Sequence, residues 1–200
     1  MALFVHTYFS PVNQYIFIAN SNSITFEVEE NYQKQSYRNR CYIFGANGKQ
    51  LLNIPISHTN KTSGKLKMKD VLIENSNWQR QHYKSLTTAY NHSPFFEFYK
   101  DDIQFIFTKK YKYLLDINID SFQFINDALD LSKKYSISKI YNENPINDFR
   151  YLAAVKNKDH IKYIPYIQMF DGENGFLKNL SILDLLFMEG PNSINYLTKL

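Results

Sequence analysis

The chain has one cysteine, no long apolar run and little excess charge among its 200 residues. With Cys41 alone no internal disulfide can form, which favours a reducing, cytoplasmic compartment. No apolar stretch approaches the roughly 18 residues that span a bilayer, and polar residues from His6 to Gln14 interrupt any signal-peptide core. The net charge of +4 is far below that of a nucleic-acid-binding tail. We therefore expect neither membrane insertion nor nucleic-acid binding.

Glycine-rich phosphate loops of the usual kinds and closely spaced metal ligands are also missing. The five histidines show no ligand spacing, so we expect no metal, and we predict no cofactor. Aromatic residues are plentiful instead, with 16 tyrosines and 16 phenylalanines in a chain that is 44% hydrophobic. They are enough to fill a sizeable core and to line a cleft.

The first 75 residues have the pattern of an α/β protein. Ala2 to Tyr8 predicts a buried strand, Ser10-Pro11 the N-cap and first position of a short helix, and Ser23 to Glu29 a half-exposed strand. This β-α-β opening favours two parallel strands. Asn47-Gly48 predicts a type I′ turn in a hairpin from Cys41 to Ile56.

The rest of the chain is mainly helical. We predict a single domain over residues 1–200, with a small mixed sheet in 1–75 and a mainly helical part in 76–200. The predicted helices begin at a Ser76 to Gln79 capping box, at Ser93-Pro94, at Asp120 (ending near Tyr135), at Ser181 and after Gly190-Pro191. The other predicted segments are a loop from His58 to Lys69, short strands at Val71 to Glu74 and Ile137 to Tyr141, and an irregular region over 142–179.

Residues 29–41 are more cationic than a connection between two strands requires. Lys34, Arg38 and Arg40 are suited to phosphate or carboxylate, because arginine offers a planar fork and lysine a point charge. The amide groups of Asn31 and Asn39 and the hydroxyl group of Tyr32 are nearby in the sequence and could bind sugar hydroxyls. We therefore predict that this segment binds an anionic small molecule such as a nucleotide sugar. The alternative is a solvated connection whose cations pair with Glu27, Glu29 and Glu30.

Two histidines are candidate bases. His82 lies one helical turn after Trp78 on the same face. It could take a proton from a sugar amine while a sugar ring stacks on Trp78; alternatively both side chains belong to the core. His6 follows the first strand, at the edge where α/β sheets bind ligands, but a buried histidine bonded to backbone is an equal alternative.

Two further residues have structural interpretations. Asp184 lies in an apolar helical run and needs a partner, for which Arg40 and Arg150 are candidates. Cys41 is expected to be a buried structural cysteine, because strand alternation points Arg40 to the other face.

Four segments, in order, resemble the signature of the WbqC-like protein family. The chain is similar to the compact form of the family found in Bacteroidetes. Longer members carry a Gly- and Tyr-rich segment before the last motif, where this chain has the irregular stretch Asn142 to Lys162. The resembling segments are Glu30 to Arg40, Gly45 to Ile56, Trp78 to Ser85 and Gln168 to Phe187.

The resemblance implies a role in glycan chemistry, since genes of this family tend to sit among surface-polysaccharide genes. It implies an enzyme of surface-polysaccharide or sugar-nucleotide modification that transfers an acyl or aminoacyl (glycyl) group to an amino sugar. The segment over 31–40 would bind the anionic donor or acceptor, and His82 or His6 would be the base. The alternative is a non-enzymatic binding or scaffolding protein of a glycan-biosynthesis assembly, with 142–179 as a partner surface. The sequence is also compatible with a homodimer.

Overall fold

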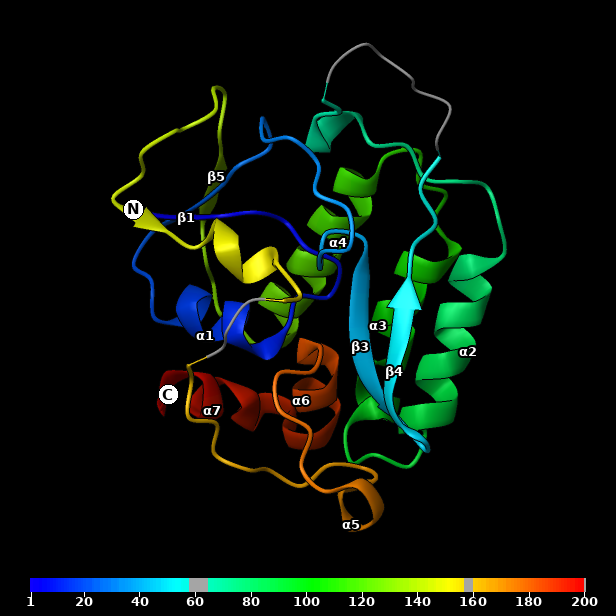
Figure 1. The fold of residues 1–200 in the computed structure, drawn as a ribbon. Helices are drawn as coiled ribbons and strands as arrows, with labels where there is room; N and C mark the ends of the chain where they lie inside the picture. The colour runs from blue at the N-terminus through cyan, green and yellow to red at the C-terminus, as the bar shows by residue number, and fades with distance from the viewer. Residues whose placement is uncertain (58–64, 157–159, 200) are drawn as a thin grey trace.

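A computed structural model describes residues 1–57, 65–156 and 160–199. Four short parallel strands form one sheet in the order β5-β2-β1-β6. β1 (Ala2–Phe4) and β2 (Ile24–Phe26) are connected by helix α1 (Val12–Ala19) and pair in parallel register (Figure 1). The predicted α/β class and the β-α-β opening are therefore confirmed. Pro11 takes the N-cap position, one residue later than predicted.

The two outer strands of this sheet come from the second half of the chain. β5 (Tyr135–Ile137) pairs with β2, and β6 (Asn147–Asp148) pairs with β1. The strand predicted over Ile137 to Tyr141 is thus displaced toward the N-terminus, and the two ranges share only Ile137. The sheet-rich and helical parts distinguished in the sequence share one hydrophobic core.

A hairpin forms a second, antiparallel sheet. β3 (Arg40–Gly45) and β4 (Gly48–Asn53) pair from Arg40 with Asn53 to Gly45 with Gly48. The predicted hairpin is confirmed, but its turn is Ala46-Asn47, one residue before the predicted position. Gly48 has a φ of +93°, which glycine adopts without a Cβ clash. The hairpin packs against α2 and α6.

The predicted helices are all present and in the predicted order, but several of their bounds differ, and α5 forms within the region predicted to be irregular. α4 begins before Asp120, which instead accepts hydrogen bonds from Lys109 and Tyr111. It ends well before Tyr135, because Asp130 and Ser132 adopt positive φ angles. Helix α2 forms without the predicted side-chain cap. The helices after α1 are α2 (Trp78–Tyr90), α3 (Phe96–Thr108), α4 (Leu114–Ala128), α5 (Asp171–Asn174), α6 (Ile182–Glu189) and α7 (Ser193–Lys199), with 3₁₀ turns at Met68–Asp70, Arg150–Ala153 and Gly190–Asn192.

Two predicted segments need comment. The prediction of a strand from Val71 to Glu74 was wrong. Leu72 and Ile73 form only isolated β-bridges, to Tyr113 and Ile56. The loop predicted over His58 to Lys69 falls largely on residues 58–64, which lie outside the described residues. Within the described ranges, no helix has the length and apolar character needed to cross a membrane.

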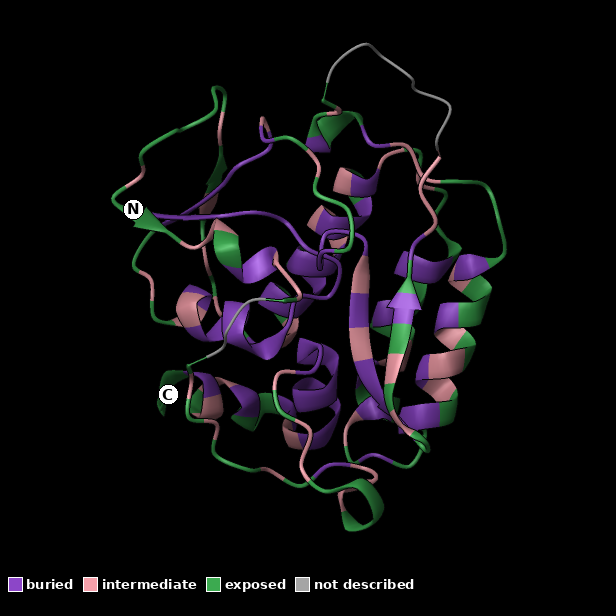
Figure 2. Ribbon diagram, viewed as in Figure 1, coloured by how far each residue is buried: buried purple, intermediate pink, exposed green. Residues whose placement is uncertain are grey.

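Helix α6 lies at the centre of the molecule, with residues 182–188 all buried (Figure 2). The prediction that Asp184 pairs with Arg40 or Arg150 was wrong. Its carboxylate accepts hydrogen bonds from Tyr90 (2.8 Å), Tyr166 (2.5 Å) and Gln168 (2.8 Å). Burial raises the pKa of this carboxyl group, and neutral donors take the place of a cation. The network ties the segment before α5 to the core.

Candidate functional site

The polar segment predicted to bind ligand is fixed by backbone hydrogen bonds at several points. Tyr32 N donates to Leu66 O (2.7 Å), and Met68 N donates to Glu30 O (2.9 Å). Further along, Tyr37 N donates to the carbonyl of Ala153 (2.8 Å). The segment is therefore an ordered wall of the protein rather than a solvated connection.

A cleft of about 490 Å³ opens beside this segment. One wall contains four residues of the predicted site. The rest of the lining comes from the end of β4, the residues after it, Leu66 and Glu74, and we call this part the second wall. Ile54 N donates to Asn39 O (2.8 Å), which joins the walls at the base of the hairpin. The predicted residues that line the cleft are Tyr32, Lys34, Asn39 and Arg40.

The cleft carries unpaired positive charge. Among the described residues, neither Lys34 nor Arg40 is in an ion pair, and Nε of Arg40 is buried without a hydrogen-bond partner. Burial raises the pKa of the Tyr32 hydroxyl, and the positive charges of Arg40 and Arg38 act to lower it. An anion in the cleft would supply the partner that Arg40 lacks.

Amide groups lie beside these cations. Asn39 Nδ2 donates to Asn53 Oδ1 (3.1 Å) and to the Ile54 carbonyl (2.9 Å). Asn39 Oδ1 is buried and has no hydrogen-bond partner among the residues that the structure describes. Asn39 therefore offers a free acceptor, as recognition of a hydroxyl or N–H group requires.

Arg38 does not line the cleft. Its guanidinium binds the Glu30 carboxylate in a bidentate pair, with distances of 2.6 and 2.8 Å, and its side chain is 1% exposed. The alternative of ion pairing within the segment thus holds for Arg38. Glu29, in contrast, pairs with Lys67 and Lys69 from the neighbouring segment. Asn31 is exposed and lies outside the cleft lining.

Neither candidate base lines the cleft. His82 is buried in the core, where its Nδ1 makes a 3.0 Å hydrogen bond with the Tyr8 hydroxyl. Burial lowers the pKa of His82 to about 4, against a smaller effect of a hydrogen bond with the Asn53 backbone. The Trp78 ring is buried against Tyr8 and His82, with an edge contact of 5.2 Å between centroids to His82. Trp78 therefore belongs to the core and has no free face for a sugar ring.

His6 is also buried, away from the cleft. Its ring stacks on Phe26 at 3.7 Å between centroids, with edges of Phe122 and Tyr135 around it. Within the described part of the chain neither ring nitrogen has a hydrogen-bond partner, and burial lowers the pKa of His6 to about 3. The structure thus does not gather His6 and His82 with Lys34 and Arg40. Cys41 is buried, and burial raises the pKa of its thiol, as expected for a structural cysteine.

The second wall of the cleft contains residues that sequence reasoning did not assign to the site. The motif Leu51 to Ile56 was noticed for its family resemblance, and part of it forms this wall. Glu74 joins it because Glu74 N donates to Pro55 O (2.9 Å). The sequence did contain a signal for this wall, because a hairpin brings its two ends together and so places the residues after β4 beside those before β3. The additional lining residues are Gln35, Asn53, Ile54, Pro55, Ile56, Ser57, Leu66 and Glu74.

Comparison with known proteins gives one family. The sequence model of the WbqC-like protein family matches residues 7–164, a range that contains the whole cleft and stops before the C-terminal segment 168–187. No curated protein and no solved structure matches the chain. Because the match covers well over half of its length, the chain belongs to the WbqC-like protein family.

Proposed function

We propose that the cleft of Lys34 and Arg40 binds an anionic small molecule, such as a nucleotide sugar or an activated acyl donor. In this proposal the protein acts in the modification of surface polysaccharide or its sugar-nucleotide precursors. The observation that carries the proposal is the buried, unpartnered Nε of Arg40 beside Lys34, in a cleft whose size suits a small ligand. A phosphate or carboxylate would pair with both cations, and the amides of Asn39 and Asn53 suit sugar or amide groups.

The reaction proposed is transfer of an acyl or aminoacyl group to the amine of a sugar. The amine nitrogen would form a bond to the activated carbonyl carbon, the bond from that carbon to the donor would break, and the amine proton would pass to a base. Among the described residues, Glu74 is the carboxylate that lines the cleft, and it is exposed, so we take it as the candidate base. His82 is buried, makes a hydrogen bond with the Asn53 backbone and does not line the cleft.

Replacing Lys34 and Arg40 together by alanine is expected to weaken binding of the anion at least about 100-fold, since each charge-assisted hydrogen bond contributes about 1.5–3 kcal/mol. Isothermal titration calorimetry with a panel of nucleotide sugars and acyl-coenzyme A thioesters measures this. The matched control, Arg80→Ala with Lys139→Ala, removes one arginine and one lysine that are exposed and lie outside the cleft. Equal loss in both double variants, or none in the first, would contradict the proposed site.

Glu74→Gln separates the enzyme from a binding protein. If Glu74 is the base, this nearly isosteric change should lower the transfer rate by about 10²–10⁴-fold while the dissociation constant of the bound donor changes little. Donor consumption and calorimetry on the same protein preparations measure the two quantities.

A non-enzymatic binding protein is the second candidate, and the absence of histidine from the described cleft lining favours it. It predicts tight anion binding, no donor consumption by the unaltered protein and no effect of Glu74→Gln. Single-stranded nucleic acid as the true ligand would instead show affinity that falls steeply with salt.

A further inference from the structure

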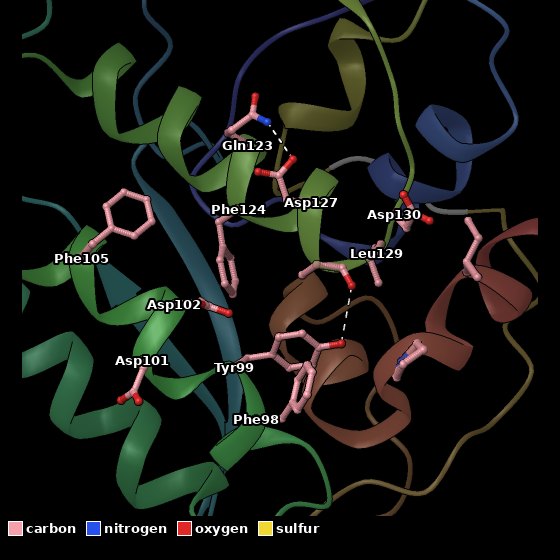
Figure 3. A pocket seen from close by; sticks show the side chains of 13 residues that line it. Phe98, Tyr99, Asp101, Asp102, Phe105, Gln123, Phe124, Asp127, Leu129 and Asp130 are labelled. Carbon is pink, nitrogen blue, oxygen red and sulfur yellow. Dashed lines mark hydrogen bonds between the residues drawn. The ribbon is translucent and has the colours of Figure 1, made fainter.

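A second hollow, larger than the cleft, lies on another face of the molecule. It has a volume of about 920 Å³ and is lined by residues of α3 and of the end of α4 (Figure 3), together with Pro191 and Ile194. We propose that this groove is a docking surface for a partner polypeptide segment that carries bulky apolar side chains flanked by lysine or arginine. The proposal is independent of the anion-binding cleft.

The apolar part of the groove is an extended strip along α3. Phe98 and Phe105 are 72% and 44% exposed, and both line it. They are seven residues apart on α3, so the apolar strip runs about 10 Å along that helix. Phe124 and Leu129 are buried beneath it and form the floor (Figure 3). An aromatic strip two helical turns long matches the anchor spacing of an amphipathic helix.

The charge of the groove is opposite to that of the chain as a whole. Four exposed aspartates line it, whereas no lysine or arginine among the described residues does so, in a protein whose net charge is +4. None of the four is in an ion pair among the described residues. Charge complementarity therefore calls for a cationic occupant. The four are Asp101, Asp102, Asp127 and Asp130.

The same charges disfavour a second copy of this chain as the occupant. A two-fold dimer through this face would place the aspartates of one protomer against those of its partner, because such an interface repeats the same patch on both sides. A small molecule is also a poorer match. Ligand pockets bury most of their ligand, whereas Phe98 lies at an open rim.

The test uses a synthetic helical peptide of about 14 residues, with leucine along one face and lysine on the other, and measures fluorescence anisotropy. Phe98→Ala should weaken binding about tenfold or more, as loss of an aromatic anchor does. Asp102→Asn with Asp130→Asn should weaken it by a similar factor and reduce its salt dependence. Asparagine suits position 130, where the backbone φ is +47°.

Two controls make the result specific. A peptide with the same leucines but glutamate for lysine should bind at least tenfold more weakly than the lysine peptide. The variant Glu97→Gln with Glu143→Gln removes two exposed carboxylates outside the groove and should leave binding within about twofold.

The proposal is overturned if the lysine peptide fails to bind, if the control variant loses as much affinity as the aspartate variant, or if amide chemical shifts change elsewhere than on α3, α4 and α7. Phe98 and the four aspartates are exposed, so we expect their substitution to leave the fold intact. Thermal unfolding curves that match those of the unaltered protein will show this.

Discussion

Lowering the pH from 7 to 5 is expected to reduce the free energy of unfolding by about 4 kcal/mol, through His6 and His82. Both are buried, and burial lowers their pKa values from 6.5 to about 3 and about 4. In the unfolded chain both rings regain the ordinary pKa. Below pH 6.5 the unfolded state therefore binds protons that the folded state does not bind. Each histidine then lowers the free energy of unfolding by about 1.4 kcal/mol per pH unit, down to its folded pKa.

The sign follows from the depressed pKa values. The contribution of these histidines to stability is fully present above pH 6.5 and is lost as the pH falls toward 4 and then 3. Asp184 acts in the opposite direction, because its raised pKa lets the folded state bind a proton before the unfolded state does. Urea unfolding followed by tryptophan fluorescence at a series of pH values measures the net effect.

Replacing one of the two histidines should divide this pH dependence. His6→Phe keeps an aromatic ring stacked on Phe26 and removes two unpartnered nitrogens, so about half of the difference between pH 7 and pH 5 should disappear. His92→Gln, at an exposed position, is the matched control and should leave the profile unchanged. A stability that stays constant from pH 7 to 5, or a profile unaltered by His6→Phe, would show that these rings are not buried in neutral form.

Arg38→Met is expected to destabilise the fold by about 3–5 kcal/mol, because it leaves the Glu30 carboxylate buried without its cation. Adding Glu30→Leu should recover most of this loss, since replacing both members of a buried pair by apolar residues is often neutral. Chemical denaturation of the two single variants and the double variant completes a mutant cycle.

The ligand-binding prediction for Arg38 gives a different pattern. If Arg38 bound the substrate directly, Arg38→Met would abolish anion binding while stability stayed within about 1 kcal/mol of the unaltered protein, as for an exposed residue. The same calorimetric panel used for the cleft distinguishes the two. Lys67→Ala is the control, because its pair with Glu29 is exposed and should contribute little.

Local patterns in the sequence determined the local structure. A buried strand, a short helix and a second strand within 30 residues lead to the parallel opening. Gly48 begins β4 directly after the hairpin turn, at a positive φ that glycine tolerates. Where a pattern was weak, the bounds moved, as at the start of α4, where Asp120 bonds Lys109 and Tyr111 rather than capping a helix.

Tertiary structure decided which polar groups remain free. Arg38 and Arg40 are two residues apart and identical in chemistry, yet one is buried against Glu30 and the other lines a cleft with an unpaired Nε. His6 and His82 likewise end in the core. The physical reason is that a side chain's exposure and partner depend on segments distant in sequence, such as the strand end at Asn53 and the residue Glu74 that complete the cleft. The sequence shows which chemical groups are present and how they are spaced, whereas the packing of distant segments determines which of those groups are buried and which remain free to bind a ligand.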